Sequence, residues 1–147
     1  MAEHVFTYEG SWQGDRSGQG EISVGGLQSV VTTPAQMGGP GQGTNPDEML
    51  LGAAATCYMM TLAFALASRK VPYERLRVSS TATFNDEGGL HCERIVHKPH
   101  VVLPSNASDA DVEKVHELVK LAESRCMVSK ALMGNVEILV EARVDRE

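Results

Sequence analysis

This 147-residue chain contains three cysteines, whose thiols can act as nucleophiles, redox groups or metal ligands. Cys57 lies in an apolar, alanine-rich stretch, Cys126 follows an arginine, and Cys92 stands between a histidine and a glutamate. An odd number of cysteines without a Cys-x-x-Cys motif fits neither a secreted disulfide framework nor a zinc ribbon. Any cysteine chemistry in this chain is therefore expected to be functional rather than structural.

The surroundings of the cysteines leave their roles open. A cysteine on an apolar helix, as predicted for Cys57, is usually a small core residue, since burial raises a thiol pKa. A reactive Cys57 needs a cation, and its own helix offers none before Arg69. Cys126 precedes a short predicted helix and follows Arg125; both features favour a thiolate, although a half-buried loop thiol fits as well. Cys92 is expected to be a bystander.

The histidines suggest two further chemistries, neither of which the spacing supports. On a β-strand His91 and His97 share one face, while Cys92 and His100 share the other, so a single metal site cannot take all four side chains. We therefore expect no metal. A cysteine–histidine hydrolase pair that includes Cys57 is possible in principle, but no local sequence favours one pairing over the others.

Composition narrows the class of protein. Hydrophobic residues at 42% and charged residues at 22% are typical of one globular domain. Thirteen Lys and Arg against nineteen Asp and Glu give a net charge of −6, which argues against nucleic acid and membrane surfaces as partners. The N-terminus lacks a basic flank followed by an apolar stretch, so we expect no signal peptide and a cytoplasmic location.

The elements that must position these residues form an α+β pattern within a single domain, 1–147. The N-terminal β-hairpin region, 1–44, contains three predicted strands and ends in a loop that is rich in glycine and proline. The predicted strands are 4–12, 20–24 and 27–33, and the loop is 34–43.

A long central helix is predicted at 46–70. Asn45 suits the N-cap, Pro46 the first helical position, and Pro72 stops the helix. Residues 49–67 carry no charge, a length at the edge of what can span a bilayer, but a core helix buried on all sides is the stronger interpretation. At about 1.5 Å per residue the helix exceeds 30 Å in length. A lone chain of this size can hardly surround it, which favours an oligomer.

The C-terminal region, 76–145, reads as ββααβ. Two alternating strands, 76–85 and 93–103, precede a helix that opens with a capping box at Ser108 and ends near Arg125. A short helix at 127–133 and a last strand at 136–144 follow. Strands that flank helices without regular βαβ alternation indicate an α+β fold.

Two segments resemble the OsmC/Ohr family of thiol-dependent peroxidases, closer to the organic hydroperoxide resistance (Ohr) side. They are residues 33–50, TPAQMGGPGQGTNPDEML, which lead into the alanine-rich helix with Cys57, and residues 125–136, RCMVSKALMGNV. The resemblance covers nearly the whole chain. It implies an OsmC-like fold, in which antiparallel sheets wrap around long central helices in an intertwined homodimer.

The resemblance also implies a reaction, the reduction of organic hydroperoxides in oxidative-stress defence. Cys57 would be the peroxidatic thiolate that becomes a sulfenic acid, and Cys126 the resolving thiol that forms a redox-active disulfide with it. Arg16 matches the catalytic arginine of the family. The acidic partner after Asn-Pro is Asp47 here in place of Glu, and Glu48 could substitute. No bound cofactor is implied; an external dithiol, lipoyl-type in Ohr-like members, would reduce the disulfide.

Helix geometry adds a prediction about assembly. Asp47 and Cys57 are ten residues apart, about 15 Å along the axis and on different faces, so a shared site calls for a two-fold homodimer. The apolar neighbours of Cys57 favour alkyl or lipid hydroperoxides over hydrogen peroxide. The alternatives are a dimeric module that binds an apolar small molecule with inert cysteines, and a thiol-dependent hydrolase.

Overall fold

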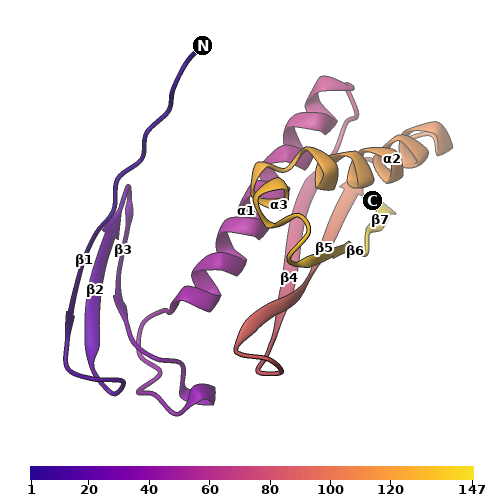
Figure 1. The fold of residues 1–147 in the computed structure, drawn as a ribbon. Coiled ribbons are helices and arrows are strands. Elements are labelled where there is room, and N and C mark those ends of the chain that lie inside the picture. Colours follow the sequence, from indigo (N-terminus) through magenta and orange to yellow (C-terminus); the bar gives the residue numbers. More distant parts are fainter. The chain divides into compact units, whose positions relative to one another are not determined.

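A computed structural model describes residues 1–147 and contains two helices of three turns or more, with strands before and after them (Figure 1). The α+β fold class is confirmed. The chain forms two compact units, Met1–Leu50 and Leu51–Glu147, which are described separately. In chain order the elements are β1 (Glu9–Gln13), β2 (Gln19–Val24), β3 (Leu27–Val31), the 3₁₀ helix η1 (Ala35–Met37), α1 (Pro46–Ser68), β4 (Arg75–Asn85), β5 (His91–Leu103), α2 (Asp109–Arg125), α3 (Met127–Leu132), β6 (Glu137–Val140) and β7 (Arg143–Arg146).

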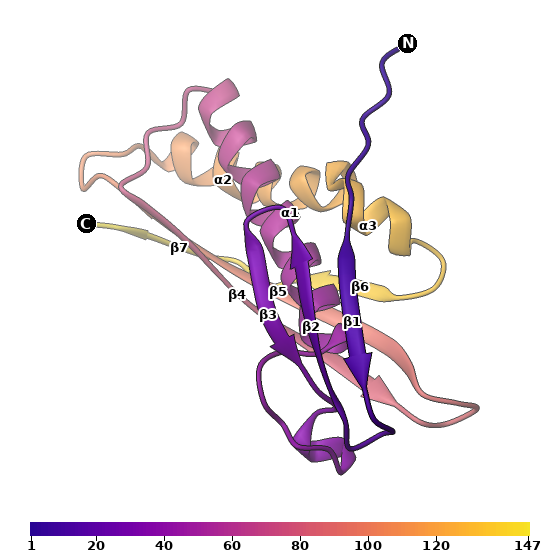
Figure 2. The same cartoon turned by 90° about the vertical axis from the view of Figure 1, so that its left-hand side faces the viewer.

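The first unit is an antiparallel meander of β1, β2 and β3 (Figure 2). Strand β1 begins at Glu9, five residues later than predicted. The reason lies in its partner: Glu9 pairs with Ser23, and β2 ends one residue later at Val24, before the chain turns at Gly25. Only Val24 of β2 therefore remains beyond this pair, which is too little to continue the ladder along the segment 4–8.

The glycine- and proline-rich loop holds η1 and returns to the sheet before α1 starts. Thr44 N–H donates to the Val30 carbonyl at 2.9 Å, and a Cβ at Gly43, whose φ is 65°, would clash with that carbonyl. Only glycine fits such a close approach with a left-handed backbone. The predicted cap is confirmed, since Asn45 Oδ1 accepts a hydrogen bond from Glu48 N–H at 2.9 Å.

Helix α1 is buried along one stripe rather than on all sides. Met60 and Phe64, on other faces, are 49% and 66% exposed, so the predicted all-round burial is not met within one chain. By length and composition alone α1 could cross a membrane, a test that core helices of soluble proteins also pass. The buried stripe follows the four-residue repeat of a helix face and consists of Ala54, Tyr58, Leu62 and Leu66.

The second unit contains a mixed four-stranded sheet with helices on one face (Figure 2). Strands β4 and β5 form an antiparallel hairpin, whereas β6 and β7 both pair parallel to β5. The single last strand predicted at 136–144 is thus two short strands. They pair with separate stretches of the 13-residue β5, and Glu141 N–H between them donates to the His97 carbonyl at 2.9 Å.

A bulge in the β4–β5 hairpin changes the face that Cys92 occupies. The register shifts between Thr83 and Phe84, and Cys92 packs against the inner-face cluster that contains Ala54 and Ile95. Strict alternation along the strand predicts Cys92 on the opposite face from His97. This prediction is wrong, because the extra residue of the bulge lies between them and inverts the alternation.

Helix α2 begins as predicted. The Ser108 hydroxyl accepts from Asp111 N–H at 3.1 Å, and the Asp111 carboxylate accepts from Ser108 N–H at 3.1 Å, which completes the capping box. One apolar face of α2 then enters the core beside α1 and β5. This face consists of Val115, Leu118, Val119 and Ala122.

Candidate functional site

The second unit brings Cys57 and Cys126 together. Cys57 lies in the middle of α1 and is half-buried, whereas Cys126 occupies the junction between α2 and α3 and is fully buried. The two thiols pack in the same hydrophobic cluster, and each shifts the pKa of the other. Both cysteines are reduced. The packing of two helices on one sheet therefore brings together two cysteines that are 69 residues apart in the sequence.

Cys57 is poised as the more acidic thiol of the pair. Burial raises its pKa, but hydrogen bonds from Val128 N–H, the Cys126 thiol and Met127 N–H outweigh burial and hold the pKa below its usual value. The Thr61 hydroxyl, one helical turn along α1, also favours the thiolate and donates to the Cys57 carbonyl at 2.8 Å. Cys57 thus obtains from the first N–H groups of α3 the stabilisation that its own helix lacks.

Cys126 has the opposite bias. Burial raises its pKa, and the Cys57 thiol raises it further, although the Ser129 hydroxyl and N–H lower it in part. The start of α3 does favour a thiolate at Cys126 through Ser129 N–H, but burial and the Cys57 thiol outweigh it, and the Met127 and Val128 N–H groups serve Cys57 instead. The pair thus combines a half-buried thiol whose pKa is lowered with a fully buried neighbour whose pKa is raised.

Sequence reasoning missed the residues that tune this pair. Thr61 lies four positions after Cys57, and Ser129 lies three positions after Cys126, so each hydroxyl is one helical turn from its sulfur. That spacing was the available signal. The Ser129 hydroxyl is buried and lies near the Cys126 sulfur, whose pKa it lowers. It forms no hydrogen bond of good geometry with any group.

A buried polar group beside the thiols fixes the position of α1. The ring of Tyr58, the residue after Cys57, stacks on His97 with 4.8 Å between centroids and an interplanar angle of 12°. Tyr58 Oη donates to the Val119 carbonyl at 2.9 Å, and Ser80 Oγ lies 2.7 Å from His97 Nδ1. Burial lowers the pKa of His97, whose Nε2 has no partner. His97 thus supports the helix that carries Cys57.

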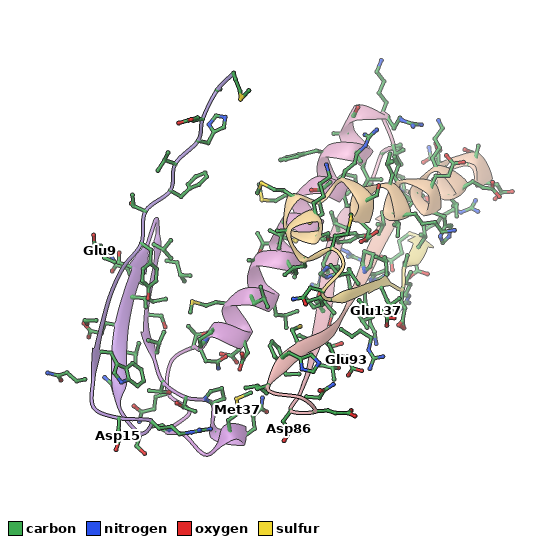
Figure 3. All side chains as sticks on the ribbon, viewed as in Figure 1. Glu9, Asp15, Met37, Asp86, Glu93 and Glu137 are labelled. Atoms are coloured by element: carbon green, nitrogen blue, oxygen red, sulfur yellow. The ribbon has the colours of Figure 1, made fainter.

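The other predicted site residues belong to the first unit. The Arg16 guanidinium donates to the Met37 carbonyl at 3.4 Å, and Thr33 Oγ1 donates to the Arg16 carbonyl at 3.0 Å. Figure 3 shows Met37 in the loop that follows the meander. Asp47 is half-buried, and Glu48 accepts from Thr44 Oγ1 at 3.0 Å.

Neither carboxylate forms an ion pair with Arg16. Because Arg16, Asp47 and Glu48 lie in one unit and the thiols in the other, a site that unites them remains a prediction.

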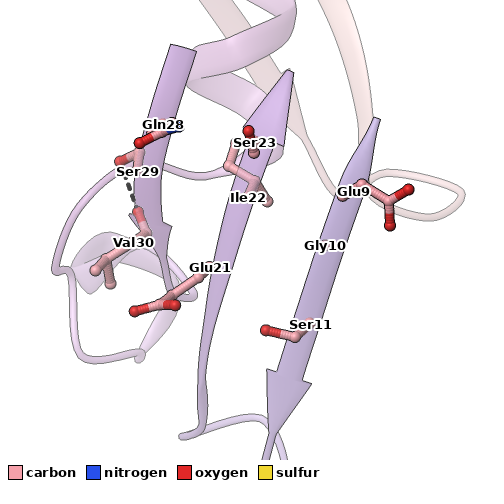
Figure 4. Close-up of a pocket in the computed structure, with 9 residues that line it drawn as sticks. All are labelled: Glu9, Gly10, Ser11, Glu21, Ile22, Ser23, Gln28, Ser29 and Val30. Carbon is pink, nitrogen blue, oxygen red and sulfur yellow. Dashed lines mark hydrogen bonds between the residues drawn. The ribbon is translucent and has the colours of Figure 1, made fainter. Parts of the chain in front are cut away.

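A hollow of the first unit is lined by none of the predicted site residues. It has a volume of about 580 Å³, lies along β1, β2 and β3, and is lined by polar side chains such as Glu9, Ser11 and Glu21 (Figure 4). It contains no cysteine. Histidine, cysteine and carboxylate side chains nowhere gather in a group of three that could hold a metal ion.

Comparisons with known proteins agree with the fold and the cysteine segments. The family described as OsmC-like protein matches residues 39–141. The uncharacterized protein YmaD of Bacillus subtilis is 46% identical over 145 residues, which are 98% of this chain and 97% of YmaD. The organic hydroperoxide resistance protein OhrB of the same organism is 28% identical over 141 residues, which are 95% of this chain and 98% of OhrB.

Solved structures show the same architecture. The crystal structure of Bacillus subtilis OhrB is similar with a TM-score of 0.69 at 25% identity, over 94% of this chain and 98% of OhrB. These matches support a peroxidase or stress-defence role. The family match, the relatives that cover the chain and the common fold identify this protein as a member of the OsmC-like protein family.

Proposed function

We propose that this protein is a thiol-dependent peroxidase that reduces organic hydroperoxides to alcohols. The observation that carries the proposal is the adjacent thiol pair in one hydrophobic cluster, in which hydrogen bonds lower the pKa of Cys57 and burial raises the pKa of Cys126. The Cys57 thiolate attacks the distal oxygen of the hydroperoxide and breaks the O–O bond. The sulfur is oxidised to a sulfenic acid, and the alkoxide leaves and takes a proton to become the alcohol.

Cys126 resolves the sulfenic acid. Its sulfur attacks the Cys57 sulfur, a disulfide forms, and the hydroxyl leaves as water with the proton that Cys126 gives up. An external dithiol, of the lipoyl type, then reduces the disulfide and restores both thiols. In sum, one hydroperoxide and one dithiol give one alcohol, one water and one oxidised dithiol. The cycle needs no bound metal or cofactor, and it serves oxidative-stress defence in the cytoplasm.

Arg16 completes the site in this proposal, with Asp47 or Glu48 holding its guanidinium. A cation near Cys57 would stabilise the thiolate and the developing alkoxide. A homodimer provides the geometry, since a second copy can cover the apolar faces of α1 that carry Met60 and Phe64. We expect a dimer by analytical ultracentrifugation at micromolar concentration; a monomer would contradict shared active sites.

The test is a disulfide map after one equivalent of cumene hydroperoxide. Mass spectrometry should find a Cys57–Cys126 disulfide in the wild type and a sulfenic acid on Cys57 in Cys126→Ser. Cys57→Ser should abolish peroxide turnover, Cys126→Ser should complete one turnover and stall, and the control Cys92→Ser should behave as the wild type. Turnover that survives Cys57→Ser would sink the proposal.

Alkylation and disulfide formation in the same proteins distinguish the peroxidase from a binding module with inert cysteines. A module of that kind predicts slow alkylation of Cys57 at neutral pH and no disulfide after peroxide. The peroxidase predicts faster alkylation of Cys57 than of an ordinary thiol at neutral pH, because a lowered pKa raises the thiolate fraction. A hydrolase would show ester turnover without peroxide.

A further inference from the structure

The hydroxyl of Ser129, on α3, differs from the other hydroxyls around the thiol pair. Serine and threonine in helices commonly donate to a carbonyl one turn back. Thr61 does so to the Cys57 carbonyl at 2.8 Å, and Ser124 does so to the Leu121 carbonyl at 2.8 Å. Ser129 is only 4% exposed, yet its Oγ has no such partner. A buried hydroxyl without a hydrogen bond is uncommon in a folded protein and calls for an explanation.

The place of Ser129 in α3 suggests one. Cys126 is the N-cap of α3 and Ser129 is the third residue of the helix, whose N–H is a usual donor to an N-cap side chain. Cys126 forms no side-chain cap in the reduced protein, as expected for a protonated thiol, which is a weak acceptor. A thiolate is a much stronger acceptor. Ionised Cys126 could therefore take hydrogen bonds from both the hydroxyl and the N–H of Ser129, and both groups lower its pKa in part.

The Cys126 sulfur has few other means of carrying a negative charge. It is fully buried, so water does not solvate it. Arg125 and Lys130, the nearest cations in the sequence, are exposed. The Cys57 thiol raises the pKa of Cys126, and Tyr58 Oη is already bonded to a carbonyl of α2 at 2.9 Å. The hydroxyl that remains available to this sulfur is that of Ser129.

We propose that Ser129 is a catalytic residue of the resolving step, in which Cys126 attacks the Cys57 sulfenic acid. This inference rests on the proposed function. The hydroxyl accepts from the Cys126 thiol at first, then turns and donates to the sulfur anion as the proton leaves. The anion attacks the Cys57 sulfur, the S–S bond forms, and the S–O bond breaks. The thiol proton and the departing hydroxide make water, so Ser129 ends the step unchanged.

Rapid-quench mass spectrometry after one equivalent of cumene hydroperoxide separates the two steps. Ser129→Ala should oxidise Cys57 at the wild-type rate but form the disulfide roughly 10–100-fold more slowly, as expected for the loss of a hydrogen bond to a charged group. Higher pH should restore much of the lost rate, because hydroxide then ionises Cys126. A packing defect would not respond to pH in this way.

Ser124→Ala is the matched control, because it removes an exposed hydroxyl that is already bonded to a backbone carbonyl. It should keep the wild-type rate of both steps. Disulfide formation at the wild-type rate in Ser129→Ala would overturn the proposal. Equal slowing of both steps in Ser129→Ala would also overturn it, since that result indicates a structural role.

A reaction without peroxide separates failure of this role from failure of the peroxidase. In a Cys92→Ser background, dithiobis(nitrobenzoate) forms a mixed disulfide with Cys57, and Cys126 then displaces the second thionitrobenzoate, whose absorbance gives the rate. Ser129→Ala should slow this second release by roughly tenfold or more. If it does so and no peroxide is turned over, the peroxidase is wrong and the role of Ser129 stands. If peroxide is turned over and the second release is unchanged, the role of Ser129 is wrong and the peroxidase stands.

Discussion

The two units of this chain differ in how much of themselves they bury. In the first, Ile22 is the one buried hydrophobic side chain of the sheet, and Trp12 and Leu27 are 47% and 50% exposed. In the second, Tyr58 and Leu62 are fully buried in a core that joins α1, α2 and the mixed sheet. A three-stranded sheet needs a second layer to cover its apolar side, and the second unit has that layer within itself.

This difference divides the candidate chemistry. The thiol pair lies in the packed unit, where its neighbours in the core and in α3 set the pKa of each sulfur. The predicted cation and carboxylates lie in the thin unit, where Arg16 contacts a backbone carbonyl and no carboxylate. A reaction that needs both sets requires the thin unit to be held by something else, and a second copy of the chain is our proposal.

The largest effect should come from the packed core. Leu62→Ala leaves a cavity among buried side chains and should lower the free energy of unfolding by about 2–5 kcal/mol. Leu27→Ala, in the first unit, should cost less than about 1 kcal/mol because half of that side chain is already exposed. Urea unfolding monitored by circular dichroism measures both. A greater loss at Leu27 than at Leu62 would mean that the thin unit is covered in solution.

A catalytic effect of somewhat smaller size should come from the thin unit. Arg16→Ala should lower kcat/KM for cumene hydroperoxide by about 10²–10³-fold, because an aligned donor at a developing negative charge contributes about 3 kcal/mol. Steady-state kinetics with a dithiol reductant measures it, and Arg77→Ala is the control for a lost positive charge. An unchanged rate in Arg16→Ala would show that the packed unit works without the thin one.

A pH-dependent effect should again distinguish the units. Burial holds the pKa of His97 below its ordinary value of 6.5, so the unfolded chain binds more protons than the native one below that pH. Stability should therefore fall as the pH drops from about 6.5 towards the pKa of the folded protein. Urea titrations between pH 5 and 8 should show this slope in the wild type and a weaker slope in His97→Phe. The control is His4→Phe in the exposed N-terminal segment, which should keep the slope of the wild type.

The smallest effect should come from the cap of α2. Ser108→Ala removes one half of the capping box and should cost about 1 kcal/mol of unfolding free energy, while Ser108→Asp should restore most of it. Thermal unfolding of the three proteins tests this order. A Ser108→Ala protein as stable as the wild type would mean that the start of α2 contributes nothing to the stability of the packed unit.

Local patterns account for what the sequence predicted well. Asn45 and Ser108 cap their helices because a side chain of that type serves N–H groups two or three residues away. The strands of the hairpin alternate, and the family resemblance follows from two segments around Cys57 and Cys126. Each of these features depends on residues that are close in the chain, so the sequence by itself determined them.

The tertiary structure alone decided what depends on distant neighbours. The Met127 and Val128 N–H groups at the start of α3 serve Cys57, and the bulge in the hairpin moves Cys92 to the inner face. The sequence of an apolar helix does not show which of its faces the chain itself covers. In α1 only one stripe of side chains is buried. The physical reason is common to all three: periodicity fixes which side chains share a face, but burial and hydrogen-bond partners come from segments that only folding brings near.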